Sequence, residues 1–126
     1  MSKEIILTTE APAPIGPYSQ AIKANGFVFT SGVIPVDPST AKVVDGAIVE
    51  QATQVMENLK AVLAASGSSL DQAVKTTCFL ADLNDFATFN GIYAKYFASD
   101  PPARSTVQVA KLPLGVLVEV ECVALL

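Results

Sequence analysis

Arg104 is the only arginine in this chain of 126 residues, which has no histidine. It lies in Pro101-Pro102-Ala103-Arg104-Ser105-Thr106, where two prolines end a helical pattern and an extended segment begins. A guanidinium holds a planar carboxylate through two parallel hydrogen bonds and stays charged at every working pH. Position alone leaves two interpretations open: a clamp for a carboxylate ligand, or a surface ion pair with Asp100 that contributes little stability.

Two carboxylates lie in the last apolar segment of the chain, at Glu119 and Glu121. In an extended strand they share one face with Leu117, Val123 and Leu125, opposite a row of valines. A carboxylate among apolar neighbours has a raised pKa and can orient or activate a water. For Glu121 we favour a solvated edge or a salt bridge to a lysine, whereas for Glu119 the spacing leaves both interpretations open.

The segment that follows the two prolines adds polar groups beside Arg104. An extended strand over residues 104–110 places Arg104, Thr106 and Gln108 on one face, where Thr106 offers a hydroxyl and its backbone carbonyl. The chain has no Ser/His/Asp set, no Cys/His pair and no glycine-rich phosphate loop. We therefore expect no metal and no cofactor. The chemistry must be mild: a substrate that nearly reacts with water by itself, held by arginine and offered a positioned water.

Composition narrows the class of protein further. The length suits one domain, residues 1–126, and no apolar run approaches the roughly 18 residues needed to span a bilayer. The start, Met1-Ser2-Lys3-Glu4, lacks a hydrophobic signal region, so we expect a cytoplasmic protein with free, buried thiols at Cys78 and Cys122. The net charge of −4, without a lysine cluster, argues against nucleic-acid and membrane partners.

Hydrophobic periodicity predicts two helices. The first follows apolar positions spaced by three and four residues from Ile48 to Leu63, with Gly67 placed to cap its C-terminus. The second has Asp82 as its N-cap, an apolar stripe from Phe86 to Phe97, and Pro101 as its stop. Strands are expected at residues 4–8, 18–24, 27–34, 72–81, 104–110 and 116–125, with an Asn25-Gly26 hairpin turn and a polar loop over residues 35–47.

This order, β-β-β-α-β-α-β-β, predicts an α+β sheet with both helices on one face and a parallel, right-handed βαβ unit over residues 72–110. Residues 27–34 and 116–125 are apolar on both alternating faces, although two helices can cover only one. We therefore expect sister subunits to cover the other face in a closed homo-oligomer.

Several motifs resemble one family along the whole chain. The segment Pro102-Ala103-Arg104-Ser105-Thr106-Val107, continuing through Lys111-Leu112-Pro113 to Val118-Glu119-Val120, is similar to the signature of the RidA (YjgF) family of reactive-intermediate deaminases. Ile15-Gly16-Pro17-Tyr18-Ser19-Gln20-Ala21, Thr30-Ser31-Gly32, Lys75-Thr76-Thr77 and Asp82-Leu83-Asn84-Asp85-Phe86 resemble further family motifs. The resemblance implies a chorismate-mutase-like α+β fold: a six-stranded mixed sheet with the last strand inside it, two helices on one face, and a homotrimer with clefts between subunits.

The implied activity is that of a 2-iminobutanoate/2-iminopropanoate deaminase. Such an enzyme hydrolyses imine and enamine intermediates of pyridoxal-phosphate enzymes to 2-oxo acids and ammonia, without a cofactor, and so limits metabolite damage. By resemblance, Arg104 binds the substrate carboxylate, Glu119 aligns the attacking water, and the Thr106 carbonyl helps to hold that water. Lining roles are implied for Tyr18, Ser31 and Gly32, and a less defined one for Asn90 on the helix face of Phe86.

Alternatives stay open at each level. Tyr18 can be a packed aromatic, Gly32 a bulge position, and Asn90 a partner for a backbone group. Thr106 stands where many relatives carry cysteine, which removes a thiol that oxidation would modify. The competing function is a non-catalytic trimeric module that senses a small carboxylate. A ribonuclease fits poorly with an acidic chain that lacks a basic stripe, and a chorismate mutase shares only the implied fold.

Overall fold

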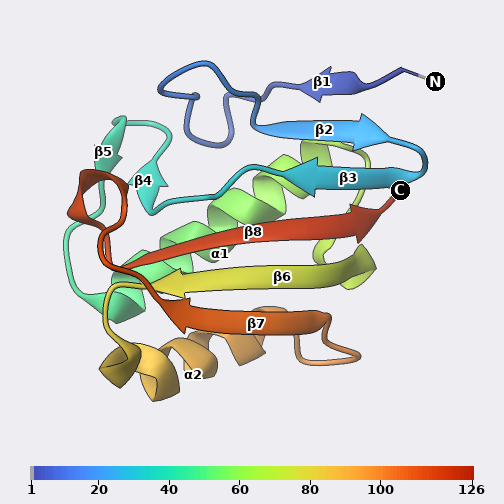
Figure 1. Ribbon diagram of the computed structural model, residues 1–126. Helices are drawn as coiled ribbons and strands as arrows, with labels where there is room; N and C mark the ends of the chain where they lie inside the picture. Colours follow the sequence, from blue (N-terminus) through green and yellow to red (C-terminus); the bar gives the residue numbers. More distant parts are fainter. Residues whose placement is uncertain (1) are drawn as a thin grey trace.

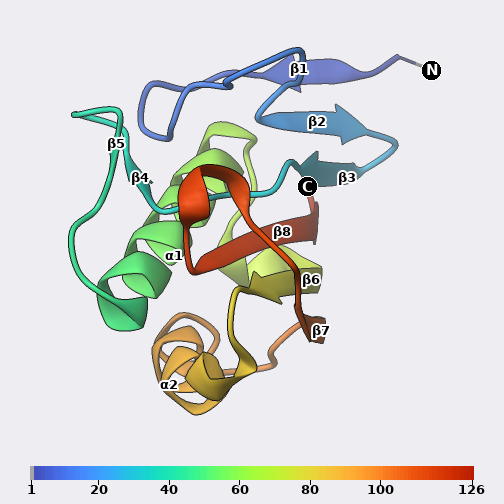
Figure 2. The same ribbon diagram turned by 60° about the vertical axis from the view of Figure 1, so that its left-hand side comes forward.

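A computed structural model describes residues 2–126 and contains one six-stranded sheet with both helices on one of its faces (Figures 1 and 2). The strand order is β1-β2-β3-β8-β6-β7. The strands are β1 (Glu4–Ile6), β2 (Ala21–Ala24), β3 (Phe27–Thr30), β6 (Ala73–Leu80), β7 (Ala103–Gln108) and β8 (Val118–Leu125); the helices are α1 (Ile48–Ala65) and α2 (Phe86–Tyr96). The expected α+β class and mixed sheet are confirmed.

The three predicted boundary signals of the two helices have different outcomes. Gly67, at φ +81, follows α1 as expected: its N–H donates to the Ala64 carbonyl and the Ser68 N–H donates to the Leu63 carbonyl, as in a Schellman cap. Asp82 accepts from the Asn84 N–H at 2.8 Å, but it caps a 3₁₀ turn over Leu83–Asp85 that leads into α2. Pro101 does not stop α2, because the helix already ends at Tyr96.

Strand pairing follows the expected topology. β6 and β7 are parallel neighbours joined through α2, and β8 pairs antiparallel with both β3 and β6, inside the sheet. Asn25 and Gly26 both have positive φ, at 55° and 83°, which is the backbone that a tight β2–β3 hairpin requires.

The segment after β3 differs from the expectation of a strand to residue 34 and a loop to residue 47. β3 ends at Thr30, the chain touches β8 again only at Val33, and a short hairpin follows, β4 (Val36–Asp37) with β5 (Lys42–Val43). Asn58 of α1 explains why this departure is stable: its side-chain amide donates to the Ile34 and Val36 carbonyls at 3.0 and 2.8 Å. The Ile34 carbonyl also accepts from the Val36 N–H at 2.9 Å, so Asn58 adds hydrogen bonds that tie this segment to α1.

The two faces of the sheet differ in burial. On the helix side, Val118, Val120, Cys122 and Ala124 of β8 are all at most 2% exposed. The opposite face, here called the open face, carries exposed apolar side chains from several strands, among them Ile5, Phe29, Val107 and Leu125. Within residues 2–126, no helix is long and apolar enough to cross a membrane.

Candidate functional site

Arg104 is held on the helix face of the sheet by residues of α2. Its Nη1 donates to Asn90 Oδ1 at 2.8 Å, and its guanidinium carbon lies 4.7 Å from the ring centre of Tyr93 and 5.4 Å from that of Phe86. Cation–π contacts of this kind favour a fixed guanidinium plane over a mobile side chain. We call Arg104, Asn90, Phe86 and Tyr93 the arginine group.

The remaining donors of Arg104 are free to bind a ligand. Within the described residues 2–126, the one ion pair is Lys23 with Glu4, and the one hydrogen bond of the guanidinium is that to Asn90. The surface pair with Asp100 that we considered from the sequence is therefore not formed here. A half-buried guanidinium with open donors favours a planar anion such as a carboxylate.

Tyr93 is a member of this group that the sequence interpretation missed, since it was assigned to an apolar helix stripe. The residue is 7% exposed, and its hydroxyl lies 2.7 Å from Thr76 Oγ1 of β6. Burial raises the pKa of Tyr93, so the phenol stays neutral and keeps its hydrogen bond to Thr76. The spacing of Phe86, Asn90 and Tyr93, at i, i+4 and i+7, places them on one helix face and was the available signal.

Thr106 lies on the same face as Arg104, but its hydroxyl does not reach a ligand. In the parallel register Thr106 pairs with Cys78, whose side chain is fully buried beneath the helices. Thr106 Oγ1 is itself buried, and its one polar neighbour among the described residues is the Cys78 thiol, which is too weak an acceptor to satisfy a hydroxyl. The Thr106 hydroxyl is therefore covered within one chain, and a role of this residue in the site stays a prediction.

Replacing Thr106 with valine is expected to leave the free energy of unfolding unchanged or to raise it by about 1 kcal/mol. An unpaired buried hydroxyl costs free energy that an isosteric methyl group does not. Thr76→Val is the matched control, because it removes a hydroxyl bonded to Tyr93 and is expected to cost about 1 kcal/mol. Urea unfolding of both variants measures this; equal losses would show that the Thr106 hydroxyl has a partner.

Glu119 lines a second part of the molecule, a pocket of about 410 Å³ that we call the glutamate pocket. Burial, and then the charge of Glu121, raise the pKa of the half-buried Glu119. A Cβ added at Gly32 would overlap the Glu119 carboxylate, so glycine is needed there for the acid to lie against the backbone. The pocket is lined by Ile15, Tyr18, Ser31, Gly32, Ile34, Pro113, Leu114 and Glu119.

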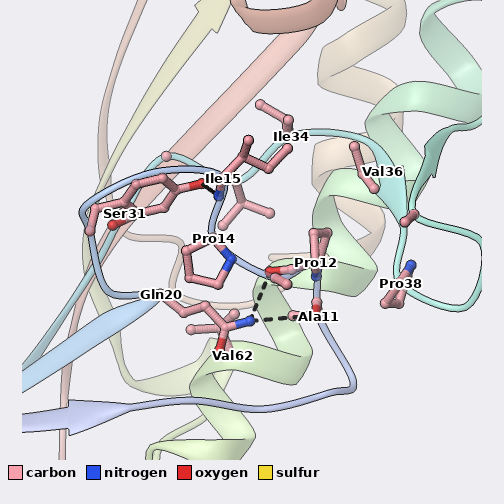
Figure 3. A pocket seen from close by; sticks show the side chains of 15 residues that line it. Ala11, Pro12, Pro14, Ile15, Gln20, Ser31, Ile34, Val36, Pro38 and Val62 are labelled. Atoms are coloured by element: carbon pink, nitrogen blue, oxygen red, sulfur yellow. Dashed lines mark hydrogen bonds between the residues drawn. The ribbon is translucent and has the colours of Figure 1, made fainter.

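The polar residues of this pocket are positioned by the loop after β1. Ser31 donates from its hydroxyl to the Ser19 carbonyl, and the Tyr18 hydroxyl accepts from the Ile15 N–H at 3.3 Å. Gly16, at φ +136, lets the chain turn between Ile15 and Tyr18. Beyond Tyr18 and Ile15, a second cavity of about 200 Å³ lies between this loop, the β4 segment and α1 (Figure 3).

The arginine group and the glutamate pocket lie on opposite faces of the sheet. Arg104 pairs with Thr76 in register and Glu119 pairs with Phe79, an odd number of residues along the same strand β6. Because side chains alternate between the faces of a strand, Arg104 points to the helices and Glu119 to the open face. Within one chain the structure thus brings Tyr18, Ser31, Gly32 and Glu119 together, and Arg104 with Asn90, but not the two sets with each other.

Neither set resembles a metal centre. In residues 2–126, no group of three or more His, Cys, Asp or Glu side chains lies close enough to hold a metal ion. The two thiols lie on the helix face, where burial raises the pKa of Cys78 to about 11 and that of Cys122 to about 12. Both are therefore protonated and unreactive at neutral pH.

Comparison with known proteins gives consistent matches along the chain. Residues 8–126 match the family model described as Endoribonuclease L-PSP. Reactive Intermediate Deaminase A, chloroplastic, of Arabidopsis thaliana is 53% identical over all of this chain and 67% of its own length. The Mus musculus 2-iminobutanoate/2-iminopropanoate deaminase is 48% identical over 97% of this chain and 90% of its own. Deaminases of this kind are hydrolases.

A solved structure extends the comparison to the fold. The solved structure of Escherichia coli TdcF with bound serine has a sequence 44% identical to this chain. The match covers 98% of both chains and has a TM-score of 0.93. The similarity therefore includes the backbone of nearly the whole chain as well as its sequence.

Proposed function

Because this chain belongs to the RidA (YjgF) family, we propose that it is an imine deaminase acting on small 2-imino acids such as 2-iminobutanoate and 2-iminopropanoate. Water adds to the imine carbon, the C–N bond then breaks, and the products are a 2-oxo acid and ammonia. An iminium carbon is already electrophilic, so positioning the substrate and one water is sufficient. Enamines released by pyridoxal-phosphate enzymes are the expected source, because they tautomerise to these imines.

The observation that carries the proposal is that the guanidinium of Arg104 has N–H donors without a protein partner in residues 2–126. Its guanidinium is oriented by Asn90 and the Tyr93 ring, and its other donors have no protein partner in residues 2–126. A 2-imino acid presents a planar carboxylate next to the reacting carbon, so binding it there fixes the position of that carbon. The related TdcF was solved with bound serine, which is also a small α-substituted carboxylate.

The residues of the glutamate pocket and Thr106 have roles that follow from the chemistry of their side chains and backbone. Glu119 aligns the attacking water and takes its proton, since its raised pKa makes the carboxylate a better base. Gly32 leaves room for the acid, and Ser31 and Tyr18 line the same pocket. The backbone carbonyl of Thr106 is a further acceptor for the water.

These roles require two copies of the chain, and we propose that they are provided by a homotrimer. Arg104 and Glu119 point from opposite faces of the sheet, so one molecule does not place both against one substrate. The exposed apolar side chains of the open face favour burial against another copy of the chain. In a closed ring, the open face of every subunit is covered in the same way. The substrate then lies between the arginine group of one subunit and the glutamate pocket of the next.

Mixing two inactive variants tests this arrangement. Arg104→Ala and Glu119→Gln chains, unfolded together and refolded, are expected to recover roughly a quarter of the native activity, because that share of random interfaces pairs an intact arginine with an intact glutamate. The measurement is hydrolysis of 2-iminopropanoate, generated by an amino-acid oxidase from alanine.

Each outcome of the mixing experiment separates two ideas. No recovery, with active native protein refolded in parallel, would place both residues of each site in the same chain. No acceleration by the native protein at all would reject the deaminase and favour a binding module.

The cytoplasm is the expected compartment, although the Arabidopsis relative is named chloroplastic.

A further inference from the structure

The cavity beyond Tyr18 and Ile15 has no role in the proposed reaction, yet it adjoins the glutamate pocket. Five residues line both spaces: Ile15, Tyr18, Ser31, Gly32 and Ile34. The two spaces are therefore neighbours that share these residues as a common wall. A substrate carbon beside Glu119 and Gly32 thus lies next to that wall.

The cavity is apolar where it extends away from Glu119. Its far wall comes from Ala11, Pro14, Val36, Pro38 and Val62, which belong to the loop after β1, the β4 segment and α1 (Figure 3). Its volume of about 200 Å³ exceeds the roughly 150 Å³ at which an apolar protein cavity already holds benzene. Space is therefore sufficient for a branched aliphatic side chain.

Two polar side chains in the lining, Gln20 and Ser31, are already occupied within the protein, whereas the Tyr18 hydroxyl accepts one hydrogen bond and keeps its proton free among the described residues. Gln20 accepts from the Thr8 N–H at 2.7 Å, and its amide nitrogen donates to the carbonyls of Thr8 and Pro12 at 3.0 and 2.8 Å. The Ser31 hydroxyl proton is used by the Ser19 carbonyl. Away from Tyr18, a polar occupant would thus lose its hydrogen bonds to water without replacement from the side chains of the lining, whereas an aliphatic one would not.

The wall between the two spaces is suited to movement. Tyr18 is 49% exposed and Ile15 73% exposed, and the hydrogen bond that joins them is long, at 3.3 Å. Rotation of the Tyr18 ring therefore breaks little packing, and it is the movement by which the cavity would open to the glutamate pocket.

We propose that this cavity is the side-chain subsite of the enzyme and that it extends the range of substrates from small 2-imino acids to those with branched aliphatic side chains, such as that derived from leucine, in preference to polar ones of similar size. The inference rests on the proposed function, because it assumes that the imine carbon lies beside Glu119. It assigns Val36 as a specificity-determining residue, since Val36 lines the cavity but not the glutamate pocket.

The test compares imines generated from alanine, leucine and phenylalanine with native protein and with Val36 variants. Val36→Phe fills the cavity and is expected to lower kcat/KM for the leucine-derived imine about tenfold relative to the alanine-derived one. Val36→Ala enlarges it and is expected to raise the relative kcat/KM for the phenylalanine-derived imine about tenfold. Val55→Ala is the matched control, because Val55 is fully buried in α1 but does not line the cavity. The control is expected to leave all three ratios unchanged.

A binding measurement separates this inference from the proposed function. Calorimetric titration of native protein and of Val36→Phe with pyruvate and with 4-methyl-2-oxopentanoate is expected to show weaker binding of the larger acid only, in the filled variant. If the native protein hydrolyses imines but Val36 variants change all substrates and both oxo acids equally, the subsite is rejected and the deaminase stands. If no imine is hydrolysed, the deaminase is rejected, and the titration alone supports or rejects the cavity as a binding site.

Discussion

Arg104→Ala is expected to lower kcat/KM for 2-iminopropanoate by about a thousandfold. Two charge-assisted hydrogen bonds to a carboxylate contribute about 3–6 kcal/mol together, which corresponds to a loss of about two to four orders of magnitude. The loss should appear in KM as well as kcat, because the carboxylate is bound in the ground state too. Steady-state kinetics with the imine generated in situ gives both constants.

Two further variants show whether activity requires the planar pair of N–H donors of Arg104 or only its positive charge. Arg104→Lys keeps the charge but loses the planar pair of donors, and we expect it to recover only part of the activity. Lys60→Ala removes an exposed cation on α1, which contributes no residue to the arginine group, and is expected to behave as native. Native activity in Arg104→Ala, with its fold and assembly intact, would remove this residue from the site.

Glu119→Gln is expected to lower kcat by about 10² to 10⁴ while leaving pyruvate binding close to native. The amide keeps the shape of the side chain but does not accept a proton from water, and general-base catalysis contributes an acceleration of this size. Kinetics and calorimetric titration on the same preparation separate the two effects. A non-catalytic carboxylate-binding module would bind pyruvate without accelerating hydrolysis in either the native protein or the variant.

The acidic limb of the pH–rate profile gives a second readout for Glu119. Its carboxylate must be ionised to act, and burial and Glu121 raise its pKa, so activity should fall at a higher pH than a solvated glutamate would give. Glu121→Gln removes the smaller of these causes and should move the limb to lower pH, with activity retained at neutral pH. If the acidic limb does not move in this variant, the titrating group that sets it is not Glu119.

Much of the fold is determined by local sequence. The 3.6-residue pattern of α1, the Gly67 cap and the Asn25-Gly26 turn all lie where the sequence predicts them, since each depends on neighbours within a few residues. The parallel β6–β7 pair follows from the handedness of βαβ crossovers, which is also nearly local. The β4–β5 hairpin was missed because part of its support comes from Asn58, more than twenty residues away, whose amide donates to the Ile34 and Val36 carbonyls.

The chemistry of the candidate site was also determined in part by the sequence. A single arginine, no histidine, and a glutamate among valines led us to expect mild chemistry without a metal, and residue types alone led to that expectation. Residue types do not show in which direction the side chains of one strand point relative to those of another. Arg104 and Glu119 lie on opposite faces only because β7 and β8 pair with β6 in particular registers, and a shift of one residue would reverse either direction.

Tertiary structure likewise decided which groups are available to a ligand. The Thr106 hydroxyl is covered, Tyr93 lies against the guanidinium, and an apolar cavity adjoins the glutamate pocket. Each of these depends on packing between elements distant in sequence, where volume and burial are set by all neighbours together. The sequence by itself thus determined the elements and the reactive groups. Only the tertiary structure decided how these groups face one another, because register and packing are collective properties of the folded chain.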